Sequence, residues 1–219
     1  MKQILFITFI FLTVNLTYSQ LDNKNCECVK NTFTEEKVDT VFHFTNGKNI
    51  VLCGFRNDET DKINYSEFVL YVCGDKEIVN FWGAVQTCNV QVKNDTLYVK
   101  ELVNLPNGRN FKFEENIWWI NKYYFSGGEL KMTSSINKEI KKYDNNEINI
   151  VLKEFESTKK GLDDNIMVLA NKLLICSISE NRIAKQYFND LETKFGTLDG
   201  AYKEEYYDLK AMLENWNKK

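Results

Sequence analysis

The sequence predicts an α+β fold, in which an N-terminal antiparallel β-sheet region is followed by a C-terminal region of about four α-helices. Two observations carry this prediction. From residue 38 to about residue 135, apolar and polar residues alternate with a period of two, and turn-forming residues interrupt the alternation at short intervals. From about residue 136, apolar residues recur every three or four positions, as they do along one face of a helix.

Three β-hairpins are predicted within residues 38–99. Their turns lie at Asn46-Gly47, Gly74-Asp75 and Asn94-Asp95, each between two runs of alternating residues. Glycine, asparagine and aspartate tolerate the positive φ angles that two-residue turns require. Each of these pairs therefore predicts a tight connection between neighbouring strands.

The register of the first hairpin follows from counting outward from a two-residue turn at Asn46-Gly47. This count pairs Phe42 with Val51 and Thr40 with Cys53. It places six side chains on one face of the hairpin: Val38, Phe42, Phe44, Val51, Cys53 and Phe55. In the third hairpin the same alternation directs another set inward: Cys88, Val90, Val92, Leu97 and Val99.

Further strands are predicted within residues 111–125 and 129–134, with turns at residues 105–110 and at Ser126-Gly127-Gly128. About eight short strands at this spacing indicate an antiparallel sheet, arranged as a sandwich or an open barrel.

Four helices are expected after residue 136. Residues that can cap a helix N-terminus precede or open each of them: Asn145 and Asn146, Asp163 or Asp164, Ser179, and Asp199. The second helix, within residues 166–178, is apolar nearly all round, so we expect it to be buried. The third ends at Gly196.

The N-terminus has the layout of a secretory signal peptide, with Lys2, an apolar run from Ile4 to Leu16, and small residues before a cleavage site after Ser19. We therefore divide the chain into a signal peptide at 1–19, a polar tether at 20–37, an antiparallel β domain at 38–135 and a helical region at 136–219 packed on or beside it. We expect an exported protein, periplasmic, extracellular or on the cell surface. No second apolar run is long enough to cross a membrane, so no transmembrane segment is expected after cleavage.

The charge balance disfavours nucleic acid as a partner. The chain has 28 Lys and Arg residues against 31 Asp and Glu residues, a net charge of −3, and no basic stripe.

Six cysteines lie beyond the predicted signal peptide. In an oxidising compartment all six are disulfide candidates: Cys26, Cys28, Cys53, Cys73, Cys88 and Cys176. Cys26-x-Cys28 also raises the possibility of a metal site, but structural zinc sites show a wider cysteine pair that is echoed by a second pair. We therefore expect no metal and no cofactor, and interpret Cys26 and Cys28 as staples that hold the tether to the sheet. Strand alternation directs Cys53 and Cys88 inward.

No recognisable catalytic set is present. His43 is the single histidine, within an apolar strand, and we interpret it as a buried or edge residue with one hydrogen-bond partner. The chain has no Gly-x-Ser-x-Gly motif. Carboxylate doublets are interpreted as solvated surface or helix-start charges: Glu35-Glu36, Asp58-Glu59, Glu114-Glu115, Asp163-Asp164 and Glu204-Glu205. Loop acids such as Asp58 and Glu59 could still meet across a cleft, as hydrolysis of a glycoside requires.

Aromatic residues concentrate in residues 118–125, WWINKYYF. Alternation directs Trp118 and Trp119 to opposite faces of a strand. Polar groups at the strand centre indicate that one face is exposed to water, since unpaired buried polar groups are costly. We predict that Trp119, Asn121 and Tyr123 share that face and form a binding site, with Trp119 and Tyr123 partly exposed.

The sequence alone thus favours a non-catalytic exported protein that binds a protein or glycan partner. An inhibitor or an immunity-type protein fits the size and charge. The alternative is a secreted hydrolase that uses loop carboxylates.

Overall fold

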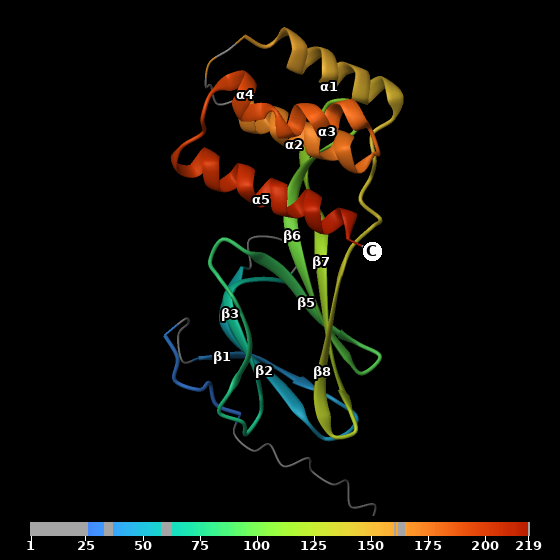
Figure 1. Ribbon diagram of the computed structural model, residues 1–219. Helices are drawn as coiled ribbons and strands as arrows, with labels where there is room; N and C mark the ends of the chain where they lie inside the picture. Colours follow the sequence, from blue (N-terminus) through green and yellow to red (C-terminus); the bar gives the residue numbers. More distant parts are fainter. Residues whose placement is uncertain (1–25, 33–36, 58–62, 160, 162–164, 219) are drawn as a thin grey trace, which may run out of the picture.

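The computed structural model describes residues 26–32, 37–57, 63–159, 161 and 165–218 and confirms the α+β class. An eight-stranded antiparallel sheet is followed by five helices (Figure 1). The helices gather at one end of the β part, and strands β6 and β7 extend into them (Figure 1). The predicted signal peptide and the start of the tether lie outside the described residues.

All eight strands of the described residues belong to one sheet. The order across the sheet is β1-β2-β3-β5-β6-β7-β8; β4 pairs with residues 68–71 of β3, whereas β5 pairs with Asn64 and Tyr65 of the same strand. The strands are β1 (Val38–His43), β2 (Asn49–Asn57), β3 (Asn64–Val72), β4 (Ile78–Trp82), β5 (Thr87–Lys93), β6 (Thr96–Asn107), β7 (Lys112–Ser126) and β8 (Glu129–Ile136).

The predicted register of the first hairpin is wrong by one residue. Phe42 pairs with Ile50 and Thr40 with Leu52. The loop has three residues instead of two: it contains Gly47, with a φ of 79°, and is closed by the hydrogen bond from the Phe44 amide to the Lys48 carbonyl. A shift of one residue exchanges the faces of one strand. Val51 and Cys53 therefore lie on the outer face of the sheet, while Ile50 and Leu52 join Phe42 and Phe44 on the inner face. Val38 also lies on the outer face, because a second irregularity between Val38 and Thr40 interrupts the alternation of β1.

The third hairpin has the predicted register. Asn94 and Asp95 both have positive φ, 49° and 59°, as a two-residue turn of type I′ requires, and Val92 pairs with Leu97. Four of the five side chains predicted to point inward are buried in the inner core: Cys88, Val90, Leu97 and Val99. Val92, at the end of its strand, is exposed.

The sheet is curved around this inner core. The ring of Phe44, after β1, meets the ring of Phe125 in β7 edge to face, with 5.1 Å between centroids. The backbone N–H and hydroxyl of Thr45 donate to the carboxylate of Asp95 at 2.7 and 2.8 Å. The first strand therefore folds back toward strands that are distant from it in the sheet order.

Two disulfides fasten the N-terminal segment to the outer face of the sheet. Cys26 bonds to Cys73 and Cys28 to Cys53, which confirms the predicted staple. Such bonds are typical of an oxidising compartment. The other two candidates, Cys88 and Cys176, are wrong as disulfide partners: both are buried and free, and each lies in a different hydrophobic core.

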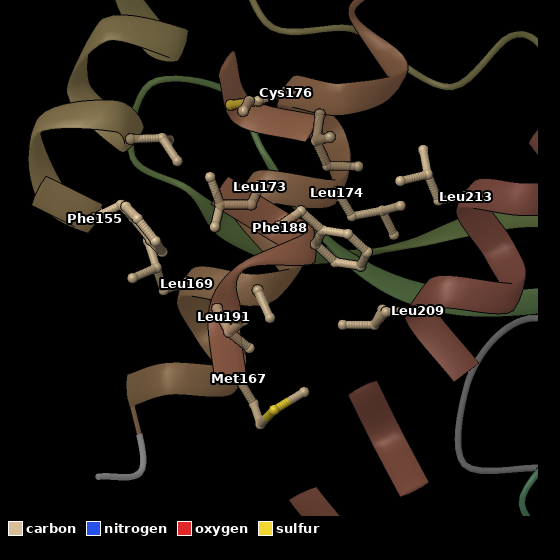
Figure 2. Packing of buried hydrophobic residues seen from close by; sticks show 14 of the residues in the cluster. Phe155, Met167, Leu169, Leu173, Leu174, Cys176, Phe188, Leu191, Leu209 and Leu213 are labelled. Atoms are coloured by element: carbon tan, nitrogen blue, oxygen red, sulfur yellow. The ribbon is translucent and has the colours of Figure 1, made fainter. Parts of the chain in front are cut away.

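The helices enclose a second core. They are α1 (Asn145–Ser157), α2 (Asn165–Ile178), α3 (Arg182–Asn189), α4 (Leu191–Phe195) and α5 (Gly200–Asn217). As predicted, α2 is buried nearly all round, and Leu173 and Leu174 lie beside Phe188 of α3 (Figure 2). Leu209 and Leu213 approach the same cluster from α5 (Figure 2). None of the helices within the described residues is long and apolar enough to cross a membrane.

The helix boundaries differ from the predicted ones in two places. Asp144, rather than Asn145 or Asn146, caps α1, because Glu147 returns the capping interaction to the Asp144 backbone. The predicted third helix is two helices, and it begins after Asn181, whose side chain accepts from the Ala184 backbone N–H, rather than at Ser179.

The extended ends of β6 and β7 join the two parts of the molecule. Leu105 of β6 and Trp118 of β7 are buried in the helical core. The hydroxyl of Tyr143, just before α1, donates to the backbone carbonyl of Pro106 at 2.8 Å. The helices are thus packed on the sheet through these strand ends.

Candidate functional site

A polar junction lies between the inner core of the sheet and the helical core. Its centre is Glu101 of β6, whose Oε1 accepts hydrogen bonds from Trp82 Nε1 and Asn121 Nδ2, both at 3.0 Å. Asn121 Oδ1 in turn accepts from Trp119 Nε1 at 3.1 Å and from the hydroxyl of Ser134. These bonds hold one carboxylate and two indole rings in fixed positions.

A β-bulge in β7 positions the tryptophans of this junction. Glu101 pairs with Trp119 and Leu102 with Ile117, so Trp118 is an extra residue without a partner in β6. The bulge interrupts alternation, and both tryptophans contact the helical core, Trp118 buried and Trp119 half-buried. The prediction that they lie on opposite faces is therefore wrong at this point of the strand.

A groove opens between α5 and the sheet at this junction. Its volume is about 640 Å³. Residues of the β4–β5 loop, β5, β6, β7 and α5 line it: Val85, Gln86, Thr87, Glu101, Leu102, Val103, Trp118, Trp119, Asp208, Ala211, Met212 and Asn215. Val85, at its mouth, is 97% exposed.

A second hollow of about 290 Å³ continues the groove along α5. It shares Val85, Thr87, Leu102, Val103 and Met212 with the first and adds Asn104, Leu105, Glu115, Asn171, Glu205 and Leu209. We call the two hollows together the α5 groove. Asn171, buried in α2, donates to Met167 O and to Glu205 Oε1, which fixes the Glu205 side chain.

The α5 groove is acidic around an apolar floor. The described residues that line it include four carboxylates and no basic side chain: Glu101, Glu115, Glu205 and Asp208. None of the four forms an ion pair within the part of the chain that the structure describes. Leu102, Val103 and Met212 form part of the apolar floor.

The structure places the three predicted binding residues on one face of β7, but that face is the covered one. Asn121 and Tyr123 are buried, at 5% and 0% exposure, so the predicted exposure of Tyr123 is wrong. The Tyr123 hydroxyl accepts from Asn80 Nδ2 at 2.7 Å, and burial raises its pKa to about 12. Of the three, Trp119 alone lines the α5 groove. The predicted role of these residues in binding stays a prediction.

The other candidates for chemistry lie elsewhere or outside the described residues. His43 is exposed on the edge strand β1, and its Nδ1 lies 2.9 Å from Asn49 Oδ1. Asp58 and Glu59, on which the hydrolase alternative depends, lie outside the described residues. Among the described side chains no group of three or more His, Cys, Asp or Glu is placed to hold a metal ion.

Sequence reasoning missed Glu101 and Asp208 as site residues. Glu101 follows Leu97 and Val99 in the inward alternation, so a charge at that position was a visible signal of a polar junction. Asp208 lies next to the predicted apolar stripe of α5, one position before Leu209. Only the approach of α5 to β6 brings the two acids into one groove.

No family model, curated protein or solved structure matches the chain.

Proposed function

We propose that this chain is a non-catalytic exported binding protein and that the α5 groove receives a protein partner. The observation that carries the proposal is the groove itself, an apolar floor with fixed polar groups at the junction of two rigid cores. Binding sites are typically concave and largely apolar, with a few well-placed polar groups. The two disulfides and the predicted signal peptide support an exported location.

The exposed residues at the mouth support a macromolecular partner. Val85 is almost fully exposed although it is apolar, and Met212 and Trp119 lie behind it in the groove. Tryptophan and methionine are enriched where proteins bind one another, because they offer contact area without charged groups to desolvate. An inhibitor or immunity-type protein fits this size and charge, as do several other classes of binding protein.

Photo-crosslinking in cells that produce the protein tests the proposal. Val85 is replaced with the photoreactive residue benzoylphenylalanine, and adducts are identified by mass spectrometry. We expect an adduct at this position that disappears in the Ala211→Trp variant, since Ala211 is an exposed residue of α5 that lines the groove and a tryptophan there fills it.

Two controls make the result specific. Ala201→Trp makes the same change at an exposed residue of α5 that is not among the groove-lining residues, and the adduct should persist. Benzoylphenylalanine at Ile150, exposed on α1, should not give the same adduct. An adduct that forms equally at Ile150, or that survives Ala211→Trp, contradicts the proposal.

A further inference from the structure

We infer that the partner segment bound in the α5 groove carries an arginine or lysine side chain, whose cation is held by Glu101 and Asp208. This inference rests on the proposed function and specifies the chemistry of the partner. Four observations support it. The groove is acidic, and one oxygen of Glu101 accepts no hydrogen bond from a described residue. Trp119 is paired with Glu101, and the acids come from both walls of the groove.

No ion pair among the described residues compensates the charge of the groove. Of its four carboxylates, Glu101 and Asp208 line the larger hollow and Glu115 and Glu205 the smaller one. Carboxylates around an apolar floor repel one another, and a cation brought by a partner removes this repulsion. Complementary charge also sets the orientation and the rate of association of such a partner.

Glu101 is prepared to receive a cation. Its Oε1 is occupied by the two N–H donors of Trp82 and Asn121. Its Oε2 accepts no hydrogen bond from any residue that the structure describes. A carboxylate oxygen accepts strongly from a guanidinium or ammonium group, and here the other oxygen already fixes the carboxylate in place.

Trp119 provides the second contact. It is the direct partner of Glu101 across the β6–β7 ladder, and its indole N–H is committed to Asn121. An indole ring attracts a nearby cation, and the methylene stem of lysine or arginine packs on apolar surface such as that of Met212. Asp208 lies on the opposite wall, in α5, so a cation between the walls meets a carboxylate on each side.

The same features favour a peptide over a glycan. The hydroxyls of a neutral sugar can donate to a carboxylate, but they bring no charge to balance four carboxylates that form no ion pair among the described residues. The groove instead offers a half-buried indole and apolar side chains beside charge. An extended segment with one basic residue flanked by apolar residues satisfies both parts of this surface.

An NMR titration with short probes tests the chemistry directly. The probe is the capped pentapeptide Ser-Leu-Arg-Leu-Ser, and its matched control carries citrulline, the neutral isostere, in place of arginine. We expect the arginine peptide to shift the Trp119 indole resonance and the amides of residues 85–87 and 208–215, with an affinity about tenfold higher than that of the citrulline peptide. Added salt should reduce the difference.

Variants connect the titration to the crosslink. Glu101→Gln keeps an acceptor for Trp82 and Asn121 and removes the charge, and Asp208→Asn removes the charge on α5. Each should weaken the arginine peptide toward the level of the citrulline peptide and reduce the Val85 adduct. Glu214→Gln, an exposed position of α5 that is not among the groove-lining residues, should leave both unchanged.

The outcomes separate this inference from the proposed function. A Val85 adduct that depends on the groove but is unchanged in Glu101→Gln and Asp208→Asn overturns the cationic partner and leaves the binding function intact. Equal binding of both peptides, or no shift with either, also overturns it. So does a neutral hexasaccharide that shifts the groove resonances when the arginine peptide does not. If the unaltered groove gives no adduct at Val85, or only one that survives Ala211→Trp, the proposed function itself is contradicted.

Discussion

At the scale of single residues, burial raises the pKa of several cysteine and tyrosine side chains. The pKa values of Cys88, Tyr143 and Tyr206 are raised well above their usual range by burial, and burial raises those of Cys176 and Tyr123 to about 12. In the unfolded chain cysteine ionises near pH ~8.5 and tyrosine near pH ~10. The folded state therefore holds these protons over a range of pH in which the unfolded state releases them.

We predict that the free energy of unfolding falls as the pH rises from about 9 toward 12. A group whose pKa is higher in the folded state contributes stability that is fully present below its unfolded pKa and is lost as the pH rises through its folded pKa. Urea denaturation at several pH values measures the effect, and Tyr123→Phe should reduce the slope because it removes one of the groups. A free energy of unfolding that is constant across this range would contradict the prediction.

The three predicted binding residues of β7 show what the alternation pattern of a single strand can and cannot predict. Alternation correctly grouped Trp119, Asn121 and Tyr123 on one face of β7. It could not reveal which face is covered, because Trp82, which meets Tyr123 edge to face, and Phe68, which stacks on Trp82, come from other strands. The assumption that a central asparagine indicates a wet face failed because Glu101 satisfies its amide inside the protein.

At the scale of elements, the strand register predicted from the sequence is correct only where the loop has the expected length. Asn94-Asp95 formed the expected two-residue turn, whereas Asn46-Gly47 became part of a three-residue loop. Both pairs are compatible with either loop length, and the choice depends on packing of the whole hairpin. The fold class is less sensitive to this choice, because it depends on periodicity over many residues.

Gly54 in β2 is the position where an added side chain should do most harm. A Cβ there would lie 2.3 Å from Phe68 Cβ and 2.5 Å from the Glu67 carbonyl oxygen, next to the bulge between β2 and β3. We predict that Gly54→Ala lowers the free energy of unfolding by about 3 kcal/mol or more, since backbone would have to move. Chemical denaturation measures the loss.

Gly83→Ala is the matched control for Gly54→Ala. An added Cβ at Gly83 meets only the Phe81 ring, at 3.9 Å, so this change should alter stability by no more than about 0.5 kcal/mol. Equal stabilities of the two variants would show that β2 and β3 can separate at the bulge at little cost.

At the scale of the whole molecule, the sheet and the helices share structure through β6 and β7. The sequence shows a change of period near residue 136 and no linker, which leaves open one domain or two. It could not show that Leu105 and Trp118, which belong to the β region, complete the core of the helices. That contact depends on the length of the two strands, and their pairing extends to the turn after Asn107.

We predict that the two parts unfold together and that Trp118→Ala destabilises both. Trp118 is buried beside Trp216 of α5, with 5.5 Å between ring centroids, so truncation should lower the free energy of unfolding by about 3–5 kcal/mol. The helical transition is followed by circular dichroism and the β transition by hydrogen exchange of β2 and β3 amides. In a single cooperative unit both probes shift by the same amount, because neither part reaches its folded state without the other. If the helical transition moves alone while the exchange of β2 and β3 stays unchanged, the β and helical regions are separate domains, and the α5 groove is an interface between them.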